Sequence, residues 1–129
     1  MKKPSFDIKV HPAYLADQSQ PAAHVYSFSY TITITNHGEQ PAQLISRHWV
    51  ITDAHGKVEE VKGLGVVGHQ PLLKPGQSFE YTSGCRLRTA TGSMQGTFHL
   101  VTEEGVPFEA PVARFYLDAS DSGETRTLH

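Results

Sequence analysis

Paired cysteines, long hydrophobic runs and an excess of either charge are all missing from this chain of 129 residues. The longest unbroken apolar run is Ala13 to Ala16, far below the roughly 20 residues needed to span a membrane. A single cysteine cannot form an internal disulfide, which favours a reducing, cytoplasmic compartment. Two lysines near the start are not followed by an apolar segment, so we expect neither a secretory signal nor a membrane partner.

The charges are nearly balanced. Eleven basic side chains stand against thirteen acidic ones, which gives a net charge of −2 with histidine neutral. Non-specific binding of nucleic acid or of an anionic membrane needs a basic footprint, and we therefore expect neither. The length suits one domain with a core of ordinary size.

Eight prolines and eleven glycines interrupt the chain and leave little room for long helices. The longest stretch free of both, residues 22–37, alternates strictly between two kinds of side chain. The apolar positions are Tyr26, Phe28, Tyr30, Ile32 and Ile34. The hydroxyl positions between and after them are Ser27, Ser29, Thr31, Thr33 and Thr35. A period of two predicts a strand with one face buried.

Weaker alternation recurs along the chain, with turn residues such as Asn36-His37-Gly38 and Lys74-Pro75-Gly76 between the segments. One of these segments, Phe6 to Val10, alternates just before Pro12. About seven strands without helices between them predict an all-β fold, an immunoglobulin- or fibronectin type III-like antiparallel β-sandwich. A small barrel is the alternative. The domain is expected to span residues 3–118, followed by a disordered polar tail, 119–129.

One segment, residues 63–68, has the spacing G-x-G-x-x-G. In dinucleotide-binding proteins this motif opens a helix whose N-terminus meets the pyrophosphate. Here Pro71 and Pro75 follow and prevent a helix, so the first interpretation is a glycine-rich connection that crosses between the sheets, with glycines that allow positive φ and close packing.

Two functional alternatives remain for the same loop, whose candidate residues are Gly63, Gly65, Val66, Val67 and Gly68. Its backbone N–H groups could form an anion nest for a nucleotide or pyrophosphate, helped by Lys62 or Lys74. If Val66 and Val67 are exposed, the loop suits a protein partner instead.

The remaining reactive side chains predict no catalytic residue, cofactor or dedicated metal site. The eight histidines lack metal-ligand spacing, and His48 meets His99 only if their strands are neighbours. Cys85 has no base near it in sequence, so we interpret it as a partly buried thiol. Arg47 shares strand parity with Trp49, which predicts a guanidinium stacked on the indole or resting over the sheet rim.

Several motifs together resemble the bacterial ApaG (CorD) family over about residues 4–117. They are Ser46-Arg47-His48-Trp49, Val61 to Pro71, Pro75-Gly76, Tyr81-Thr82-Ser83-Gly84 and Gly92-Ser93-Met94-Gln95-Gly96. The resemblance implies a fibronectin type III-like, non-enzymatic module that binds a protein partner. It also associates the chain with cobalt and magnesium efflux, with divalent metal binding as a weaker alternative, and makes residues 63–68 the proposed nucleotide or pyrophosphate contact.

One departure concerns the last strand. It reads Val112-Ala113-Arg114, where the family often has proline before the arginine-like position. Without that proline we expect the edge of this strand to be less protected against pairing, which permits a homodimer through sheet continuation.

Overall fold

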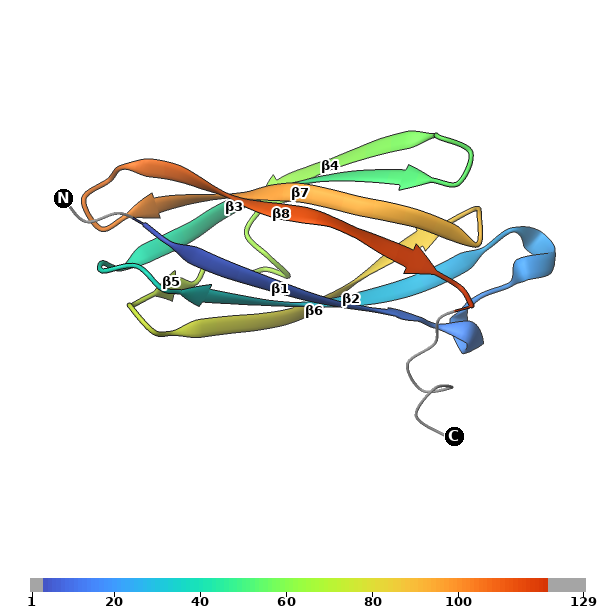
Figure 1. Ribbon diagram of the computed structural model, residues 1–129, viewed down its shortest axis with the longest axis horizontal. Helices are drawn as coiled ribbons and strands as arrows, with labels where there is room; N and C mark the ends of the chain where they lie inside the picture. The colour runs from blue at the N-terminus through green and yellow to red at the C-terminus, as the bar shows by residue number, and fades with distance from the viewer. Residues whose placement is uncertain (1–3, 121–129) are drawn as a thin grey trace.

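The computed structural model describes residues 4–120, in which two β-sheets pack face to face (Figure 1). One sheet has the order β1-β2-β6 and the other β4-β3-β7-β8, with β5 beside β3, and every pair is antiparallel. The bounds are β1 Phe6–Tyr14, β2 Tyr26–Asn36, β3 Ala42–Asp53, β4 Val58–Leu64, β5 Leu72–Leu73, β6 Ser78–Leu87, β7 Thr91–Thr102 and β8 Pro107–Asp118. The predicted sandwich is confirmed, with two separate sheets rather than a closed barrel.

Strand β2 has the two faces that its alternation predicts. Phe28 and Ile32 lie in the core with at most 1% of their surface exposed. The hydroxyl face looks outward, where Thr31 bonds Thr82 of β6 at 2.8 Å. Burial of the apolar face is what stabilises this strand, because it removes large side chains from water.

The centre of the core is an aromatic group around Trp49. Its ring meets those of Tyr30, Phe98 and Phe115 edge-on, with centroids 5.6, 5.8 and 6.1 Å away. Gly96 of β7 lies opposite Trp49, and a Cβ there would run into the carbonyl of His48. The glycine lets the two strands pair while the indole fills the interior.

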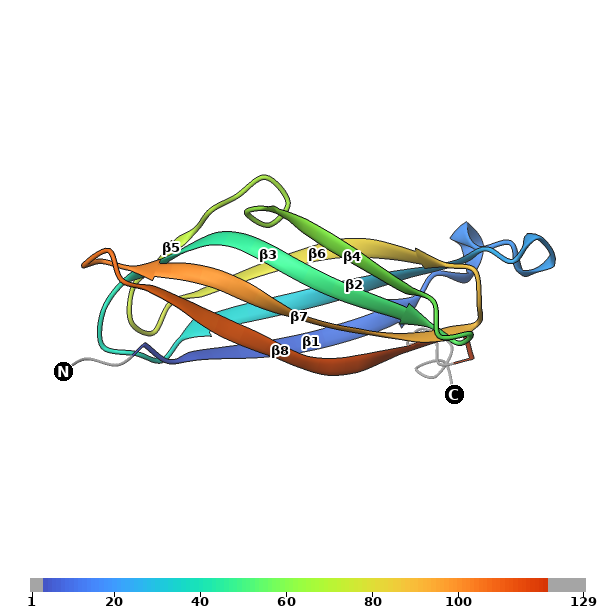
Figure 2. The same cartoon turned by 90° about the horizontal axis from the view of Figure 1, so that it is seen from above.

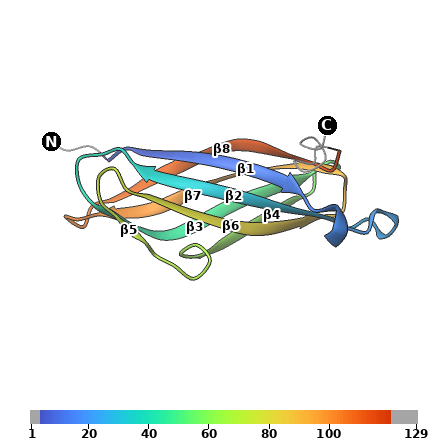
Figure 3. The ribbon, with the colours of Figure 1, turned by 90° about the horizontal axis from the view of Figure 1, so that it is seen from below.

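The two sides of the sandwich differ. Along one side β1 and β8 lie next to each other (Figure 2), with the rings of Phe6 and Phe108 5.7 Å apart. On the opposite side the outer strands are β4 and β6 (Figure 3). That second side carries the segment with the G-x-G-x-x-G spacing.

Two features of the sheet edges are not apparent from the sequence. Strand β1 continues through Pro12 to Tyr14, because it pairs only with β2 and an edge strand tolerates proline. The edge of β8 is better protected than its sequence suggests. Its register shifts between Met94 and Gly96, which leaves a bulge, and β1 runs alongside it.

The ends of the domain are only partly described. Ala119 follows β8 and donates its N–H to the carbonyl of Ala90 at 2.9 Å. Residue 3 and residues 121–129 lie outside the described residues. The expected boundary at residue 118 and the expected disorder of the tail therefore stay predictions.

Candidate functional site: the glycine-rich loop

The glycine-rich loop is held against a bulge in β3. Strand β4 ends at Leu64, and the chain then stands out from the side of the sandwich before it reaches β5 (Figure 2). Gly65 donates its N–H to the carbonyl of Ile45 at 2.8 Å, and the Gln70 side chain donates to the same carbonyl at 2.9 Å. Ile45 continues the β3–β4 register opposite Gly65, and it lies at the point where the β3–β7 register shifts. One carbonyl thus fixes both flanks of the loop.

The tip of the loop is a tight turn in an unusual conformation. Val66 and His69 exchange two backbone hydrogen bonds, at 2.8 and 3.0 Å. The central residues Val67 and Gly68 have φ of 48° and 80°, as in a type I′ turn. A β-branched residue is an outlier at positive φ, because its Cβ substituents crowd the backbone.

The two valines of the loop have opposite environments, which corrects the expectation that both could face a partner. Val66 is fully buried and belongs to the core, whereas Val67 has 57% of its surface exposed. Leu64 and Leu72, on the flanks of the loop, are also exposed large apolar residues. The sequence could not separate the valines, since valine itself gives no signal of a turn with positive φ.

Arg47 forms the inner wall of the loop. Its Nη1 donates to the carbonyls of Leu64 at 3.1 Å and Gly65 at 2.9 Å. A Cβ on Gly63, which pairs with Arg47 across the strands, would stand 2.8 Å from that nitrogen. Of the two positions predicted for Arg47, the structure shows the sheet rim, where the guanidinium holds the loop backbone.

The interior beside Arg47 is shielded from water. Burial raises the pKa of Tyr81, and the nearby Arg47 guanidinium only partly offsets this effect. Burial likewise raises the pKa of Tyr30. Both phenols therefore stay neutral, and the positive charge that acts on them is that of the Arg47 guanidinium.

The backbone of the loop is largely occupied with its own hydrogen bonds. The N–H groups of Gly65 and Val66 donate within the protein, and the Leu64 and Gly65 carbonyls accept from Arg47. Within residues 4–120, the amides of Val67 and Gly68 remain free at the tip. An anion nest needs successive converging N–H groups. These two amides are the backbone donors of the loop that could bind a nucleotide or pyrophosphate, and such binding stays a prediction.

The two histidines singled out by the sequence do lie on neighbouring strands, since β3 pairs with β7. Each is turned to a carboxylate instead. His48 Nε2 lies 2.7 Å from Glu60, and His99 Nδ1 lies 3.5 Å from Glu109. In the described part of the chain no three histidine, cysteine or acidic side chains gather in a group that could hold a metal ion.

Cys85 is a protonated thiol on the inner side of β6. Burial, and to a lesser extent the charge of Glu59, raises the pKa of this thiol to about 11. A catalytic thiol requires the opposite shift, because only the thiolate is the nucleophile. The interpretation of Cys85 as a partly buried thiol agrees with its intermediate exposure.

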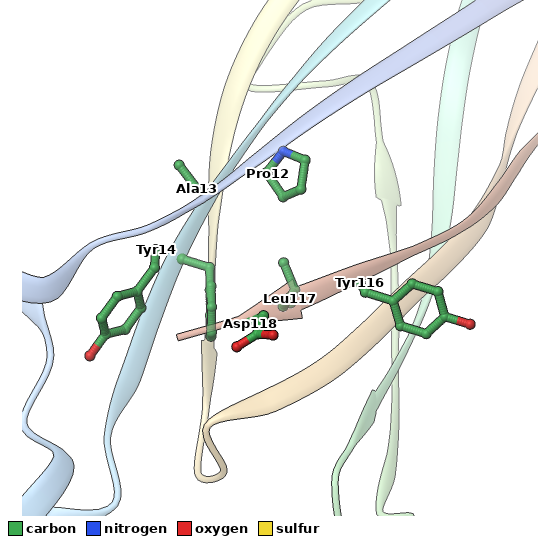
Figure 4. Close-up of a pocket in the computed structure, with 7 residues that line it drawn as sticks. Pro12, Ala13, Tyr14, Tyr116, Leu117 and Asp118 are labelled. Carbon is green, nitrogen blue, oxygen red and sulfur yellow. The ribbon is translucent and has the colours of Figure 1, made fainter. Parts of the chain in front are cut away.

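The cavities at the other end of the sandwich do not involve this loop. Figure 4 shows one that lies between Tyr14 and Leu117 and has a volume of about 20 Å³, enough for a single water molecule. A wider groove of about 410 Å³ shares the Leu117 wall and extends to Thr52. Neither has a lining residue from the loop. No helix among the described residues has the length and apolar character needed to cross a membrane.

The fold and the loop define a class: an immunoglobulin- or fibronectin type III-like sandwich with a braced glycine-rich loop on its open side, where β4 and β6 are the outer strands. The ApaG domain matches residues 16–102 of this chain. The chain is 62% identical over 128 residues to Protein ApaG of Acidovorax sp. (strain JS42), covering 95% of this chain and 93% of the relative. The crystal structure of the ApaA protein of Bordetella pertussis superposes with a TM-score of 0.89 at 56% identity, covering 91% and 95%. The chain belongs to the ApaG family.

Proposed function

We propose that this protein is a non-enzymatic, cytoplasmic binding module. Its contact surface is the glycine-rich loop, residues 63–68, together with the sheet edge on the same side of the sandwich. The observation that carries the proposal is Val67, an exposed apolar side chain in a left-handed conformation at the tip of a braced turn.

The energetics of the turn support a role in binding. Val67 is only partly buried in the monomer, with 57% of its surface exposed, and its positive φ costs on the order of 1 to 2 kcal/mol. Strain of this kind persists where the surroundings impose it, and it is common at functional sites. Burial of a valine in a partner recovers about 1.5 kcal/mol. The bonds from Gly65 and Arg47 hold the turn before binding, which lowers the entropy cost of association.

Association with a partner is tested by comparing two matched variants. Val67→Ser removes the apolar tip, and Val106→Ser removes a valine of similar exposure from the β7–β8 turn (57% and 53%). Immobilised wild-type and variant proteins are exposed to native cytosol, and each recovered protein is then titrated individually. We expect Val67→Ser to weaken specific binding about tenfold, a loss of about 1.4 kcal/mol, while Val106→Ser has no effect. Equal binding by both variants would remove the loop from the proposal.

We attribute the association with cobalt and magnesium efflux to partner binding at the same surface. A module of this kind would influence efflux through the protein that it binds, without coordinating the ion. We expect the partner recovered through Val67 to be the same with and without added Mg²⁺ or Co²⁺. A partner whose binding requires the ion would favour the alternative in which the metal is bound directly.

A further inference from the structure

Strand β4 presents a row of backbone groups along its free edge, in which the Leu64 carbonyl already accepts one hydrogen bond from Arg47. Asp53 donates to the carbonyl of Lys57 at one end of the β3–β4 pair, and Gly65 donates to Ile45 at the other, at 3.0 and 2.8 Å. Backbone groups alternate along an antiparallel strand, so the odd-numbered residues of β4 bond to β3. The N–H and C=O groups of the even-numbered residues between them therefore point to the free edge. These residues are Val58, Glu60, Lys62 and Leu64.

We propose that this edge pairs with β4 of a second copy of the chain, antiparallel, with the two-fold axis at Val61. This inference rests on one part of the proposed function, namely that a protein binds the sheet edge. The protein that binds it here is a second copy of the same chain. The eight strands β8-β7-β3-β4 and β4-β3-β7-β8 then form one sheet. A symmetric dimer of this kind closes on itself, because the same surface is used twice.

The outer face of β4 is self-complementary in this register. Glu60 stands opposite Lys62 of the second copy, and the symmetry repeats the pair. Val58 stands opposite Leu64, which brings together two large apolar side chains that are 56% and 76% exposed in the single chain. Charge and apolar area are thus matched by one and the same alignment.

The inner face is complementary as well. Glu59 stands opposite Gly63 of the second copy, and the Arg47 guanidinium lies over Gly63. Glu59 is on the inner face, since its charge acts on the thiol of Cys85 on the facing sheet. The dimer therefore places a carboxylate beside the guanidinium that braces the glycine-rich loop.

The other outer strands are less suited to such pairing. Strand β1 contains Pro12 and runs beside β8, while β8 contains Pro107 and Pro111 and is bulged. At the open side, the loop covers part of β6 through contact of His69 with Phe79, whose ring centroids are 5.7 Å apart. Only β4 among these four carries two exposed large apolar side chains along a regular edge.

The first test is sedimentation equilibrium over a range of concentrations with charge-reversed variants. An interface of a single strand is small, so we expect a dissociation constant on the order of 10 to 100 µM. Lys62→Glu places like charges opposite each other and should weaken the dimer at least tenfold. The double variant Glu60→Lys with Lys62→Glu should restore it to within about threefold, because the attraction is regained with its sign reversed.

Glu109→Lys is the matched control, since Glu109 also pairs with a histidine on this sheet but lies on β8. It should leave the dimer unchanged. A wild-type chain that stays monomeric at millimolar concentration, or a dimer that is indifferent to Lys62→Glu, would overturn the proposal.

A cross-linking test reads the register directly. In the proposed dimer Val61 faces its own copy in a non-hydrogen-bonded pair, where Cα atoms are about 4.5 Å apart and a disulfide can form. In a Cys85→Ser background, Val61→Cys should therefore cross-link to a covalent dimer under mild oxidation, whereas Val58→Cys, which faces Leu64, should not. Equal cross-linking by both would contradict the two-fold axis at Val61. The comparison of Val67 with Val106 reads the loop alone, so failure of the dimer and failure of loop binding are distinguishable.

Discussion

The guanidinium of Arg47 lies across the backbone of Gly63, so closely that any side chain at residue 63 would displace it. This contact joins the β3–β4 pair to the loop, because the same guanidinium bonds the carbonyls of Leu64 and Gly65. The charge thus serves to hold backbone in place. A hydrogen bond to a charged donor contributes about 1.5 to 3 kcal/mol when its partners are shielded from water.

Replacement of Arg47 by methionine should therefore loosen the loop while it keeps most of the packing. We expect the free energy of unfolding to fall by about 2 kcal/mol, measured by urea denaturation. Amide exchange at Gly65 should accelerate more than exchange in β2. Arg86→Met is the control, since Arg86 is exposed on β6. If both variants lose the same stability, the bonds to the loop carbonyls do not matter.

Two glycines of the loop allow two effects of a side chain to be measured separately: the strain of a positive φ and a steric collision with neighbouring backbone. Gly65 and Gly68 both have positive φ, at 65° and 80°. A Cβ on Gly65 would also collide with the carbonyl of His69, whereas a Cβ on Gly68 meets open space. Gly68→Ala should cost about 1 kcal/mol and Gly65→Ala about 3 kcal/mol or more, in the same urea assay. Similar losses for the two would show that the turn can relax away from His69.

The sequence was informative wherever one periodic rule decided the structure. Strict alternation in residues 22–37 predicted β2 and its buried face, and the prolines after Gly68 correctly excluded a dinucleotide-type helix. It could not locate the bulge at Ile45. A bulge inserts one residue that has no signature of its own, yet it changes which side chains share a face.

The structure of the candidate loop could be predicted from the sequence only in part. The glycine spacing pointed to residues 63–68, whereas the bond from Arg47 depends on the β3–β4 register, which no local pattern states. The opposite environments of Val66 and Val67 follow from a positive φ at a residue that normally avoids it. Propensity rules fail at such a position because the surrounding bonds override them.

The strain at Val67 can be relieved by asparagine. Val67→Asn gives the turn the Asn-Gly pair that type I′ turns favour, and asparagine tolerates positive φ far better than valine. We expect the free energy of unfolding to rise by about 1 kcal/mol while partner binding through the loop falls. Thermal denaturation and the binding titration check the two effects together. A gain in stability with unchanged binding would mean that the strain is unrelated to recognition.

Isothermal titration with pyrophosphate and ATP tests the remaining anion hypothesis. The Gly65 and Val66 amides already donate within the protein, and Arg47 already donates to the loop. We therefore expect no measurable heat at millimolar ligand, with inorganic sulfate as the reference anion. Saturable heat that Gly68→Ala abolishes would instead show that the free amides at the tip are enough to hold a phosphate.

The thiol of Cys85 gives a pH-dependent readout of the interior. Burial and Glu59 raise its pKa to about 11, compared with about 9 for an ordinary thiol. At pH 8 the folded protein then contains about one hundredth of the thiolate of the unfolded chain, so iodoacetamide should react about a hundredfold more slowly. Because the folded state holds the proton more tightly, this contribution to stability is complete below pH 9 and is lost as the pH rises towards 11. Glu59→Gln removes the smaller cause and should speed alkylation a few-fold. Equal rates in the folded and unfolded protein at pH 8 would show that the thiol is open to solvent.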